Sequence, residues 1–543
     1  MSFEREQADA VVIGAGPNGL VAANLLADAG WDVVVLEAGP SPGGGVSSAD
    51  YLGGGYVADV CSAFYPLAAV SPVMSSLRLE DHGLEWVHSP DVLAHPMPDG
   101  RTAVLNRRVA ETADNLSAFA PEDGAAWRRL VDLFEEVLEP LRAALFTPFP
   151  PMRAATRLAR VLGPGGMLRF ARLATLPVRR LAQEEFRGEG GPLLLAGCAM
   201  HADLSPESAG SSAFGWLLAM LGQHYGFPVP KGGAGQITAA LTHRLEARGG
   251  RVVCNARASR VVVQRRRASA VATSGGPVIR ARRAVLADVA ATHLYGQLVP
   301  WEHLPSRLFD DIARFQWDYS TFKVDWALSA PVPWSAKEAA SAGTVHLSDS
   351  VDEMTRYCTD IATGRAPARP FVLLGQMATA DSSRAPAGGE VVWAYTHIPR
   401  EVKGDAGPDG ITGAWDSTEL EAFAARIESR IETYAPGFSR LIRTRHVMGP
   451  HQLEGHDPNL VGGAINGGTT SIHQQLVFRP TPGLGRPETP VAGLYLASAS
   501  AHPGGAVHGA CGANAARAAL KAVGMAGRLR SGALVAGQRR IIG

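Results

Sequence analysis

Three glycines near the start of the chain have the spacing of a dinucleotide-binding turn. Gly14, Gly16 and Gly19 follow the apolar run AVVI and open an apolar-faced helical segment, with Pro17 and Asn18 between them. Glycine at these places allows a tight turn, a close approach of backbone to a diphosphate, and close packing of helix on strand. The free N–H groups at the start of a helix also attract phosphate. The pattern therefore predicts a bound dinucleotide.

The residues after this helix indicate which dinucleotide is bound. A second buried strand, DVVVLE, ends in Glu37 and is followed by Ala38, and a carboxylate at this point can accept hydrogen bonds from ribose hydroxyls. A nicotinamide-binding domain would continue into another helix and strand. A second glycine cluster follows instead, which favours FAD, and we assign to this part of the site Gly43, Gly44, Gly45, Val46 and Ser62.

Three stretches of the chain, taken together, resemble the phytoene-desaturase-like flavoproteins. They are the N-terminal unit at 8–39, VPKGGAGQITAALTHRLEARGGRVVCNARASRVVV at 229–263, and GLYLASASAHPGGAVHGACGANAARAAL at 493–520. RRAVLADVAATHLY at 282–295 resembles the strand that returns the chain beneath the cofactor. The family includes carotenoid desaturases, isomerases, one class of carotenoid ketolase and phytoene dehydrogenase-related oxidoreductases. Within it, the chain is most similar to uncharacterised members of actinobacterial type.

The resemblance implies an α/β fold with two interleaved domains. A glutathione-reductase-like Rossmann FAD-binding domain would be built from separated segments, at 1–75, 229–300 and 485–525. An α+β substrate domain would occupy 76–228, with a helical, arginine-rich subdomain, and 301–484, with a sheet and helices on one face; 526–543 is a basic tail, plausible as a disordered end. In the substrate domain we expect strands at 321–334, with one buried face, and at 389–399, and a helix at 419–438.

The resemblance also places further residues beside the FAD. Ala258 would lie beside the adenine, and Ser500 stands where many flavoproteins carry an aspartate for the ribityl chain. A turn near the end of the chain would face the O2 edge of the flavin ring and is formed by Gly505, Val507, His508 and Gly509. The N-terminus of the helix that follows would favour the negative charge of the reduced flavin.

Two side chains are candidates for a catalytic role. His508 would lie against the flavin ring, where it either takes part in the chemistry or only packs. Lys323 lies on a predicted strand, and a buried lysine near flavin can bind water or an acidic partner; we do not expect an ion pair with Asp325. We expect no metal site, because glycine and proline interrupt any common helix face among His446, His451 and His456.

Composition narrows the class of protein further. Of the 543 residues, 46% are hydrophobic and 19% charged, and the formal net charge is zero, which is typical of a globular protein with no general attraction for nucleic acid. The five cysteines show no CxxC spacing, which indicates a reducing cytosol rather than a disulfide framework. The charged start, MSFEREQAD, lacks an apolar signal region, and no apolar run is long enough for a bilayer. We therefore expect a cytoplasmic protein.

Two further stretches have open interpretations. Residues 142–187 contain nine arginines and only two acidic residues, so the stretch is either a peripheral contact with an anionic membrane surface or a solvated helical subdomain. Residues 457–478 combine glycine pairs with uncharged polar side chains. They form either a loop near the substrate or the flavin, or a buried connection.

These features predict an FAD-dependent desaturase or dehydrogenase. It would transfer a hydride from a C–C bond of an apolar substrate, such as an isoprenoid, polyene or lipid-like molecule, to N5 of the flavin. Since no second GxGxxG follows a strand, the electrons would pass to an acceptor such as oxygen or a quinone rather than to a bound nicotinamide. The alternatives are a carotenoid-type ketolase, a redox-neutral isomerase, an amine-oxidase-like enzyme, and a non-catalytic flavoprotein scaffold.

Overall fold

The first of two large sheets contains the predicted dinucleotide-binding strands. The computed structural model describes residues 7–542, so the charged stretch at 1–6 lies outside the described residues. The sheet has the strand order β10-β11-β12-β1-β2-β9, with β20 paired to β12. Its strands are β1 (Gln7–Ile13), β2 (Val33–Leu36), β9 (Arg251–Val253), β10 (Ala258–Gln264), β11 (Arg267–Thr273), β12 (Val278–Ala287) and β20 (Leu494–Leu496).

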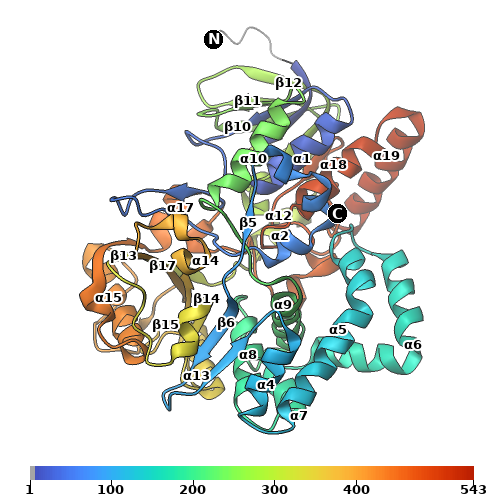
Figure 1. The fold of residues 1–543 in the computed structure, drawn as a ribbon. Coiled ribbons are helices and arrows are strands. Elements are labelled where there is room, and N and C mark those ends of the chain that lie inside the picture. Colours follow the sequence, from blue (N-terminus) through green and yellow to red (C-terminus); the bar gives the residue numbers. More distant parts are fainter. Residues whose placement is uncertain (1–6, 543) are drawn as a thin grey trace.

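Five of these strands are parallel, as in a Rossmann fold. They are β20, β12, β1, β2 and β9, whereas β10 and β11 form an antiparallel extension. Apolar faces of three helices pack on one side of the sheet, namely α1 (Pro17–Asp28), α10 (Gly235–Glu246) and α18 (Ala510–Lys521). The strands and helices come from both ends and the middle of the chain (Figure 1). The α/β fold class with a Rossmann-type domain is confirmed, while the segment boundaries remain predictions.

The second sheet has seven strands in the order β19-β13-β17-β16-β14-β6-β7. Its pairings are antiparallel except for β14 with β6. The strands are β6 (Asp91–Pro96), β7 (Thr102–Leu105), β13 (Ser320–Leu328), β14 (Ala342–Leu347), β16 (Val372–Gln376), β17 (Glu390–Ile398) and β19 (Ile442–Met448).

Both faces of this second sheet are buried, and the expected single buried face at 321–334 is wrong. One face packs on α15 (Ser417–Tyr434), and the other packs on α8 (Gly190–Ala199), α9 (Ser211–Tyr225) and α13 (Val351–Ala362). All nine residues of β13 are buried, and the strand ends at Leu328 rather than continuing. The alternating sequence pattern predicts that one face of this strand is exposed. Helices α8 and α9, which come from a distant part of the chain, cover that face in the folded protein.

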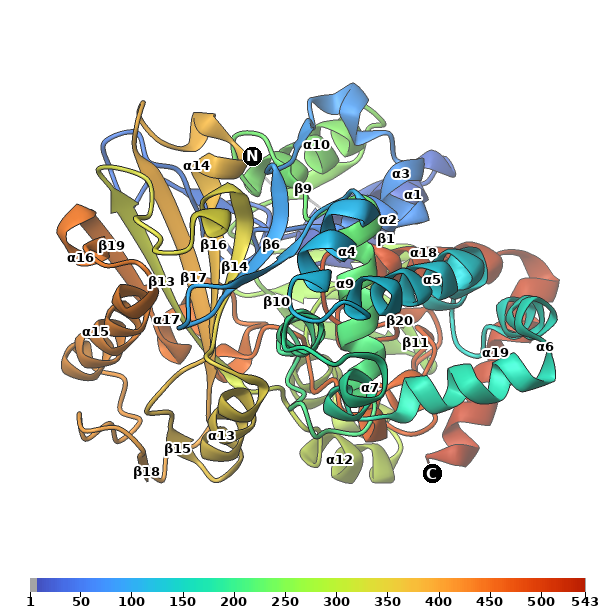
Figure 2. The ribbon, with the colours of Figure 1, turned by 60° about the horizontal axis from the view of Figure 1, so that its bottom comes forward.

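The arginine-rich stretch folds into helices at the side of the molecule. It includes the end of α5 (Asp123–Leu145), α6 (Met152–Thr175) and α7 (Val178–Glu185) (Figure 2). Ion pairs with acidic residues engage Arg142, Arg172, Arg179 and Arg180. On α6, Met152 and Leu168 are largely exposed beside Arg153, Arg157, Arg160 and Arg169. A membrane contact here stays a prediction.

The C-terminal segment forms a helix rather than a disordered end, and a contribution of this basic tail to a membrane contact stays a prediction. Helix α19 spans Gly524–Ile541 and extends along the edge of the molecule (Figure 1). Gln538 is buried and donates a hydrogen bond of 2.7 Å to the carbonyl oxygen of Glu488, and the guanidinium of Arg539 donates to the carbonyl oxygen of Pro490 at 2.9 Å. These contacts near its end hold the helix against the loop before β20.

Candidate cofactor and active site

The first glycine turn connects β1 to α1. Gly14 has a positive φ of +92°, and Gly16 precedes the helix, which begins at Pro17. A Cβ atom on Gly19 would lie 2.2 Å from the carbonyl oxygen of Gly14, so only glycine permits this packing of helix on strand. The side-chain oxygen of Asn18 is buried here without a hydrogen-bond partner among the described residues. The turn therefore has the close-packed glycine geometry and the helix start that a diphosphate requires.

The predicted ribose-binding acid lies directly across this turn. The carboxylate of Glu37 accepts hydrogen bonds from the backbone N–H groups of Ala15 at 2.8 Å and Gly39 at 2.7 Å. Ala38 lies between Glu37 and Gly39 in the sequence. The N–H of Ala256 donates to the carbonyl oxygen of Glu37 at 2.8 Å, which brings the start of β10 to the same edge of the sheet. The predicted adenine neighbour on β10 is Ala258.

The second glycine cluster folds back onto the first turn. The N–H of Gly43 donates to the carbonyl oxygen of Ala15 at 3.0 Å, and the hydroxyl of Ser62 donates to the carbonyl oxygen of Gly45 at 3.1 Å. The same loop contains Gly44 and Val46. Residues 43–62 thus form a second layer of backbone over the site defined by the first turn.

A buried acid inside the first turn is a functional residue that the sequence reasoning missed. The carboxyl oxygen Oδ2 of Asp288 accepts a hydrogen bond of 2.7 Å from the N–H of Gly19. Burial, together with the nearby acids Asp457 and Glu37, raises the pKa of Asp288 to about 8. The missed signal is its place directly after β12, since β12 pairs in parallel with β1 and the ends of both strands meet at one edge.

A second unpredicted acid comes from the loop at 457–478. A Cβ atom on Gly44 would lie 2.8 Å from a carboxyl oxygen of Asp457, and burial raises the pKa of this acid. The side chain of Asn459 accepts a hydrogen bond of 2.9 Å from the N–H of Ala290, just after β12. The structure therefore places this loop against the glycine turns. No spacing in the sequence links the loop at 457–478 to the glycine turns.

The C-terminal turn ends at Gly509, directly before α18. The hydroxyl of Ser71 donates to the carbonyl oxygen of His508 at 2.7 Å, and Nδ1 of His508 accepts a hydrogen bond of 3.0 Å from the N–H of Ala510. Burial lowers the pKa of His508 to about 4, so its ring is neutral near pH 7. One ring nitrogen is thus already used to hold the helix start, which favours a positioning role over proton transfer.

The rest of this turn is framed by the loop at 457–478. The Ser500 hydroxyl accepts from the N–H of Ala291 and donates to the carbonyl oxygen of Gly467, both at 3.1 Å, so it is already engaged. A Cβ atom on Gly505 would lie 2.9 Å from the backbone of Asn466. The side chain of Val507 packs against the core between α1 and the sheet.

A buried cation beneath this turn was also missed. The guanidinium of Arg479 is fully buried and donates to the carbonyl oxygens of Ala499 at 2.7 Å, Asn466 at 2.8 Å and Thr469 at 3.0 Å. It forms no ion pair with any residue from 7 to 542, and burial lowers its pKa. A Cβ atom on Gly504 would lie 3.3 Å from its central carbon. A positive charge therefore lies directly beside the turn predicted to hold the flavin ring.

The expectation that Lys323 does not pair with Asp325 is wrong. Both side chains are buried on the same face of β13 and form an ion pair, and the Tyr51 hydroxyl donates to the same carboxylate at 2.8 Å. The ring of Tyr51 stacks on His446 at 4.0 Å between centroids. Solvent does not compete with this pair, because α8, α9 and segment 51–64 cover that face of the sheet. Lys323, Asp325 and Tyr51 form one buried polar cluster around Oδ2 of Asp325, while Oδ1 of Asp325 has no hydrogen-bond partner among the described residues.

These residues fit FAD. The turns at 14–19, 43–46 and 505–509 supply glycines that allow a close approach of backbone to a ligand, the starts of α1 and α18 supply N–H groups, and Glu37 supplies an acceptor for ribose. Lys323 lies on β13 of the second sheet, in the part of the chain predicted to form the substrate domain. Among residues 7–542, no group of three or more potential metal-ligating side chains forms a metal site. The individual cofactor contacts remain predictions.

Comparison with known proteins defines the class. Residues 18–393 match the model of the flavin-containing amine oxidoreductases, and the chain belongs to this family of FAD-dependent oxidoreductases. Both the FAD cofactor and the resemblance to phytoene-desaturase-like proteins are thereby confirmed. Among residues 7–542, no helix has the length and apolar character needed to cross a membrane.

Individual relatives cover nearly the full chain at low identity. Pyridine nucleotide-disulfide oxidoreductase domain-containing protein 2 of Rattus norvegicus is 28% identical over 94% of this chain and 92% of its own. One of the subunits of the limonene dehydrogenase of Castellaniella defragrans is 24% identical over 96% of both chains. Phytoene desaturase (lycopene-forming) of Pseudescherichia vulneris is 25% identical over 94% of this chain and 98% of its own.

Solved structures share the fold. An oxidoreductase from Methanosarcina mazei aligns with a TM-score of 0.60 at 16% identity, over 94% of this chain and 99% of its own. Putrescine oxidase bound to putrescine aligns with a TM-score of 0.57 at 16% identity, over 98% of this chain and its full length. At this identity the likeness concerns the fold alone.

Proposed function

We propose that this oxidoreductase is a desaturase or dehydrogenase that removes hydrogen from a C–C bond of an apolar substrate, such as an isoprenoid, polyene or lipid-like molecule. The observation that carries the proposal is the buried cluster of Lys323, Asp325 and Tyr51 on the inner face of the second sheet. Because the ion pair with the lysine cancels the charge of the carboxylate, the cluster offers no net negative charge for a cationic substrate.

The wall around this cluster is aromatic. The indole N–H of Trp393 donates to the carbonyl oxygen of Cys61 at 2.9 Å, which ties the sheet to the loop of the second glycine cluster. The ring of Trp393 contacts Phe64 at 6.2 Å and Tyr395 at 5.2 Å between centroids. Flat apolar side chains hold hydrocarbon by dispersion and by exclusion of water. This composition supports an uncharged, extended or cyclic hydrocarbon portion in the substrate.

The proposed reaction removes two hydrogens from adjacent carbons and leaves a C=C bond. FAD, when bound, accepts one of them as a hydride, with the two electrons, and the other leaves as a proton. In a conjugated substrate the developing positive charge is spread, so a weak base or water is sufficient to accept the proton. Lys323, Asp325 and Tyr51 would hold this part of the second sheet rigid and dry. The electrons would pass on to oxygen or a quinone.

The relatives support this proposal, and the family supports one alternative. The relatives include a phytoene desaturase and part of a limonene dehydrogenase, and both names describe the removal of hydrogen. The family name and the fold shared with putrescine oxidase favour an amine oxidase as the second candidate. Ketolase, isomerase and scaffold roles have no observation of their own in the structure.

Anaerobic reduction of the FAD-loaded protein would test the proposal. We expect bleaching of the flavin absorbance by one or more apolar polyenes or terpenes, and a product that has lost two hydrogen atoms by mass spectrometry. Primary amines and diamines are tested in the same way, as substrates for the alternative function of an amine oxidase. Bleaching by amines alone would contradict the proposal. Addition of oxygen or a quinone to the reduced protein would then identify the acceptor.

A further inference from the structure

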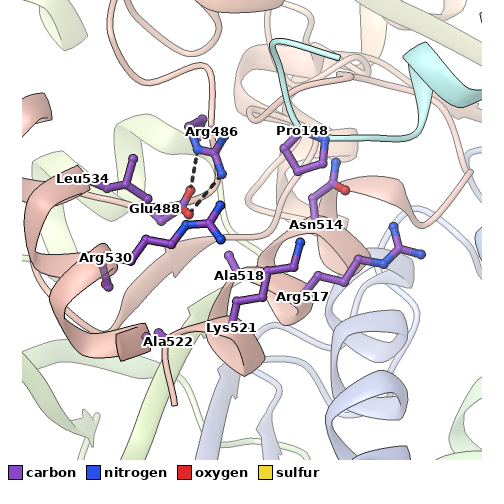
Figure 3. A pocket seen from close by; sticks show the side chains of 12 residues that line it. Pro148, Arg486, Glu488, Asn514, Arg517, Ala518, Lys521, Ala522, Arg530 and Leu534 are labelled. Carbon is purple, nitrogen blue, oxygen red and sulfur yellow. Dashed lines mark hydrogen bonds and ion pairs between the residues drawn. The ribbon is translucent and has the colours of Figure 1, made fainter. Parts of the chain in front are cut away.

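A pocket outside the cofactor turns lies between α18, α19 and the connection that leads into α6. It is a partly open pocket with a cavity volume of about 50 Å³, lined on one side by Pro148, which precedes α6, and on the other by residues of both C-terminal helices (Figure 3). None of its lining residues belongs to the glycine turns at 14–19, 43–46 or 505–509. The proposed redox chemistry does not use it.

The lining of this pocket carries a large excess of positive charge. Arg517 and Lys521 come from α18, Arg530 comes from α19, and Arg486 comes from the loop before β20. The one acidic residue in the lining, Glu488, is paired with Arg486 at 3.2 Å. Three cations therefore remain without a counter-charge in the pocket.

These three cations also lack partners elsewhere. Between residues 7 and 542, no hydrogen bond or ion pair engages Arg517, Lys521 or Arg530. Arg517 is partly buried, and burial lowers its pKa, which shows that its charge is held away from water without compensation. Close cations repel one another and favour an anion between them.

A buried amide adds a second, independent sign of a ligand. Asn514 is 1% exposed, and neither its side-chain nitrogen nor its side-chain oxygen has a hydrogen-bond partner among the described residues. Figure 3 shows its amide next to Pro148, on the same side as Arg517 and Lys521. An unpaired buried amide is unfavourable, so a polar partner is expected at this place.

We propose that this pocket binds a phosphate-bearing anion. A phosphate monoester or diphosphate carries up to several negative charges and many acceptor oxygens, which match three uncompensated cations and one amide donor. A single carboxylate would satisfy one guanidinium at most in a bidentate contact. The phosphate comes either from a soluble molecule or from a lipid headgroup. The lipid source is included because Met525 and Leu529, which are exposed apolar side chains, lie on the same helix as Arg530.

The position of the pocket links the anion to the flavin-ring turn. Asn514, Arg517 and Lys521 belong to the helix whose start is held by His508. The connection that contains Pro148 also carries Phe146, whose ring contacts the ring of His508 at 5.8 Å between centroids. An anion in the pocket would therefore bind to α18 and lie against the α5–α6 connection at Pro148.

Calorimetric titration of the FAD-loaded full chain with inorganic pyrophosphate would test the soluble source. FAD loading keeps pyrophosphate out of the dinucleotide turn. The test variant is Arg517→Gln/Lys521→Gln, and the matched control is Arg314→Gln/Arg356→Gln, which removes two exposed arginines elsewhere. We expect saturable binding that weakens by at least about tenfold in the test variant and not in the control, because two charge-assisted contacts are lost.

Sedimentation with vesicles would test the lipid source. Neutral phosphatidylcholine vesicles are compared with vesicles that also contain phosphatidic acid, using the same two double variants. Binding to phosphatidic acid alone, lost in Arg517→Gln/Lys521→Gln, assigns a headgroup, and binding to pyrophosphate alone assigns a soluble phosphate.

Two results would overturn the proposal: no binding of either probe by the wild type, or equal binding by wild type and test variant. If the double variant loses FAD or unfolds at a lower temperature than the wild type, the single variant Arg530→Gln, which removes one exposed charge of the pocket, replaces it in both binding experiments.

Discussion

The carboxyl group of Asp288 accepts a 2.7 Å hydrogen bond from the backbone N–H of Gly19, so an acidic residue lies inside the glycine turn that is built for a diphosphate. A charged carboxylate would repel the diphosphate. Burial raises the pKa of Asp288 to about 8, so the neutral form predominates near pH 7 and is compatible with the cofactor. The binding of FAD is therefore coupled to this proton.

We predict that the affinity of the cofactor-free protein for FAD falls as the pH rises through about 8, because Asp288 then becomes charged. Asp288→Asn should remove this dependence while it keeps the bond to Gly19 through the amide oxygen. Quenching of FAD fluorescence between about pH 6 and pH 9 measures the affinity of both proteins for FAD. The same raised pKa makes the free energy of unfolding of the cofactor-free protein fall as the pH rises from the ordinary carboxyl range toward about 8. Identical pH profiles for wild type and Asp288→Asn would contradict the coupling.

We predict that Gly512→Ala is strongly destabilising. A Cβ atom at this position would lie 1.9 Å from the carbonyl oxygen of Asn18, so α18 must move away from α1 and from the dinucleotide turn. The free energy of unfolding should fall by about 1–3 kcal/mol, and FAD content should fall with it. Gly532→Ala in α19 is the matched control, because nothing lies within 4 Å of its added Cβ and alanine favours a helix. Denaturant-induced unfolding measures the stability of both variants. Equal free energies of unfolding for Gly512→Ala and Gly532→Ala would contradict close packing at Gly512.

The buried cluster on β13 leads to a third prediction. Lys323→Met leaves the carboxylate of Asp325 buried without its cation and should lower the free energy of unfolding by about 3–5 kcal/mol. Lys323→Met/Asp325→Leu removes both charges and should be less destabilised than the single variant. Lys337→Met, at an exposed position, is the control and should stay within about 0.5 kcal/mol of wild type. A double variant that is less stable than Lys323→Met would show that the pair stabilises the sheet by itself.

The two interpretations of His508 can be separated by size-matched variants. Its Nδ1 holds the N–H of Ala510, and the side-chain oxygen of asparagine reaches the same place. We expect His508→Asn to keep the stability and the rate of flavin reduction, and His508→Ala to lose about 1 kcal/mol of stability. A large loss of reduction rate in His508→Asn, with stability unchanged, would instead assign the ring a part in the chemistry.

Arg479 should set the redox potential of the flavin. Its buried charge lies beside the turn predicted to hold the ring, where it would stabilise the anionic reduced form. Arg479→Met should lower the midpoint potential by at least about 30 mV, which corresponds to about 1.4 kcal/mol for two electrons. Arg479→Lys keeps the charge and should recover most of the potential. Spectroelectrochemical titration measures the midpoint potential of each variant. An unchanged potential in folded Arg479→Met would show that the guanidinium of Arg479 does not act on the flavin ring.

The glycine spacing determined the cofactor-binding half of this protein by itself. Gly14, Gly16 and Gly19 stand between two buried strands, and Glu37 ends the second strand. These features are local, because a tight turn, a helix start and a strand end depend on neighbours within about thirty residues. Dinucleotide binding could be predicted for this reason, the second glycine cluster at 43–45 favoured FAD, and the resemblance of three separated stretches implied the family and its Rossmann-type fold; all of these are confirmed.

Only the tertiary structure decided which charged groups surround the site. Asp288 bonds to Gly19, which is 269 residues away in the chain, and the guanidinium of Arg479 is buried against the carbonyl oxygen of Ala499 beside the C-terminal turn. The covered face of β13 turned Lys323 and Asp325 into a buried pair. The energies of such charges depend on burial and on partners brought by distant elements, and sequence spacing does not encode these quantities. The sequence therefore determined where the backbone can bind a dinucleotide, and the packing of distant segments decided its electrostatic environment.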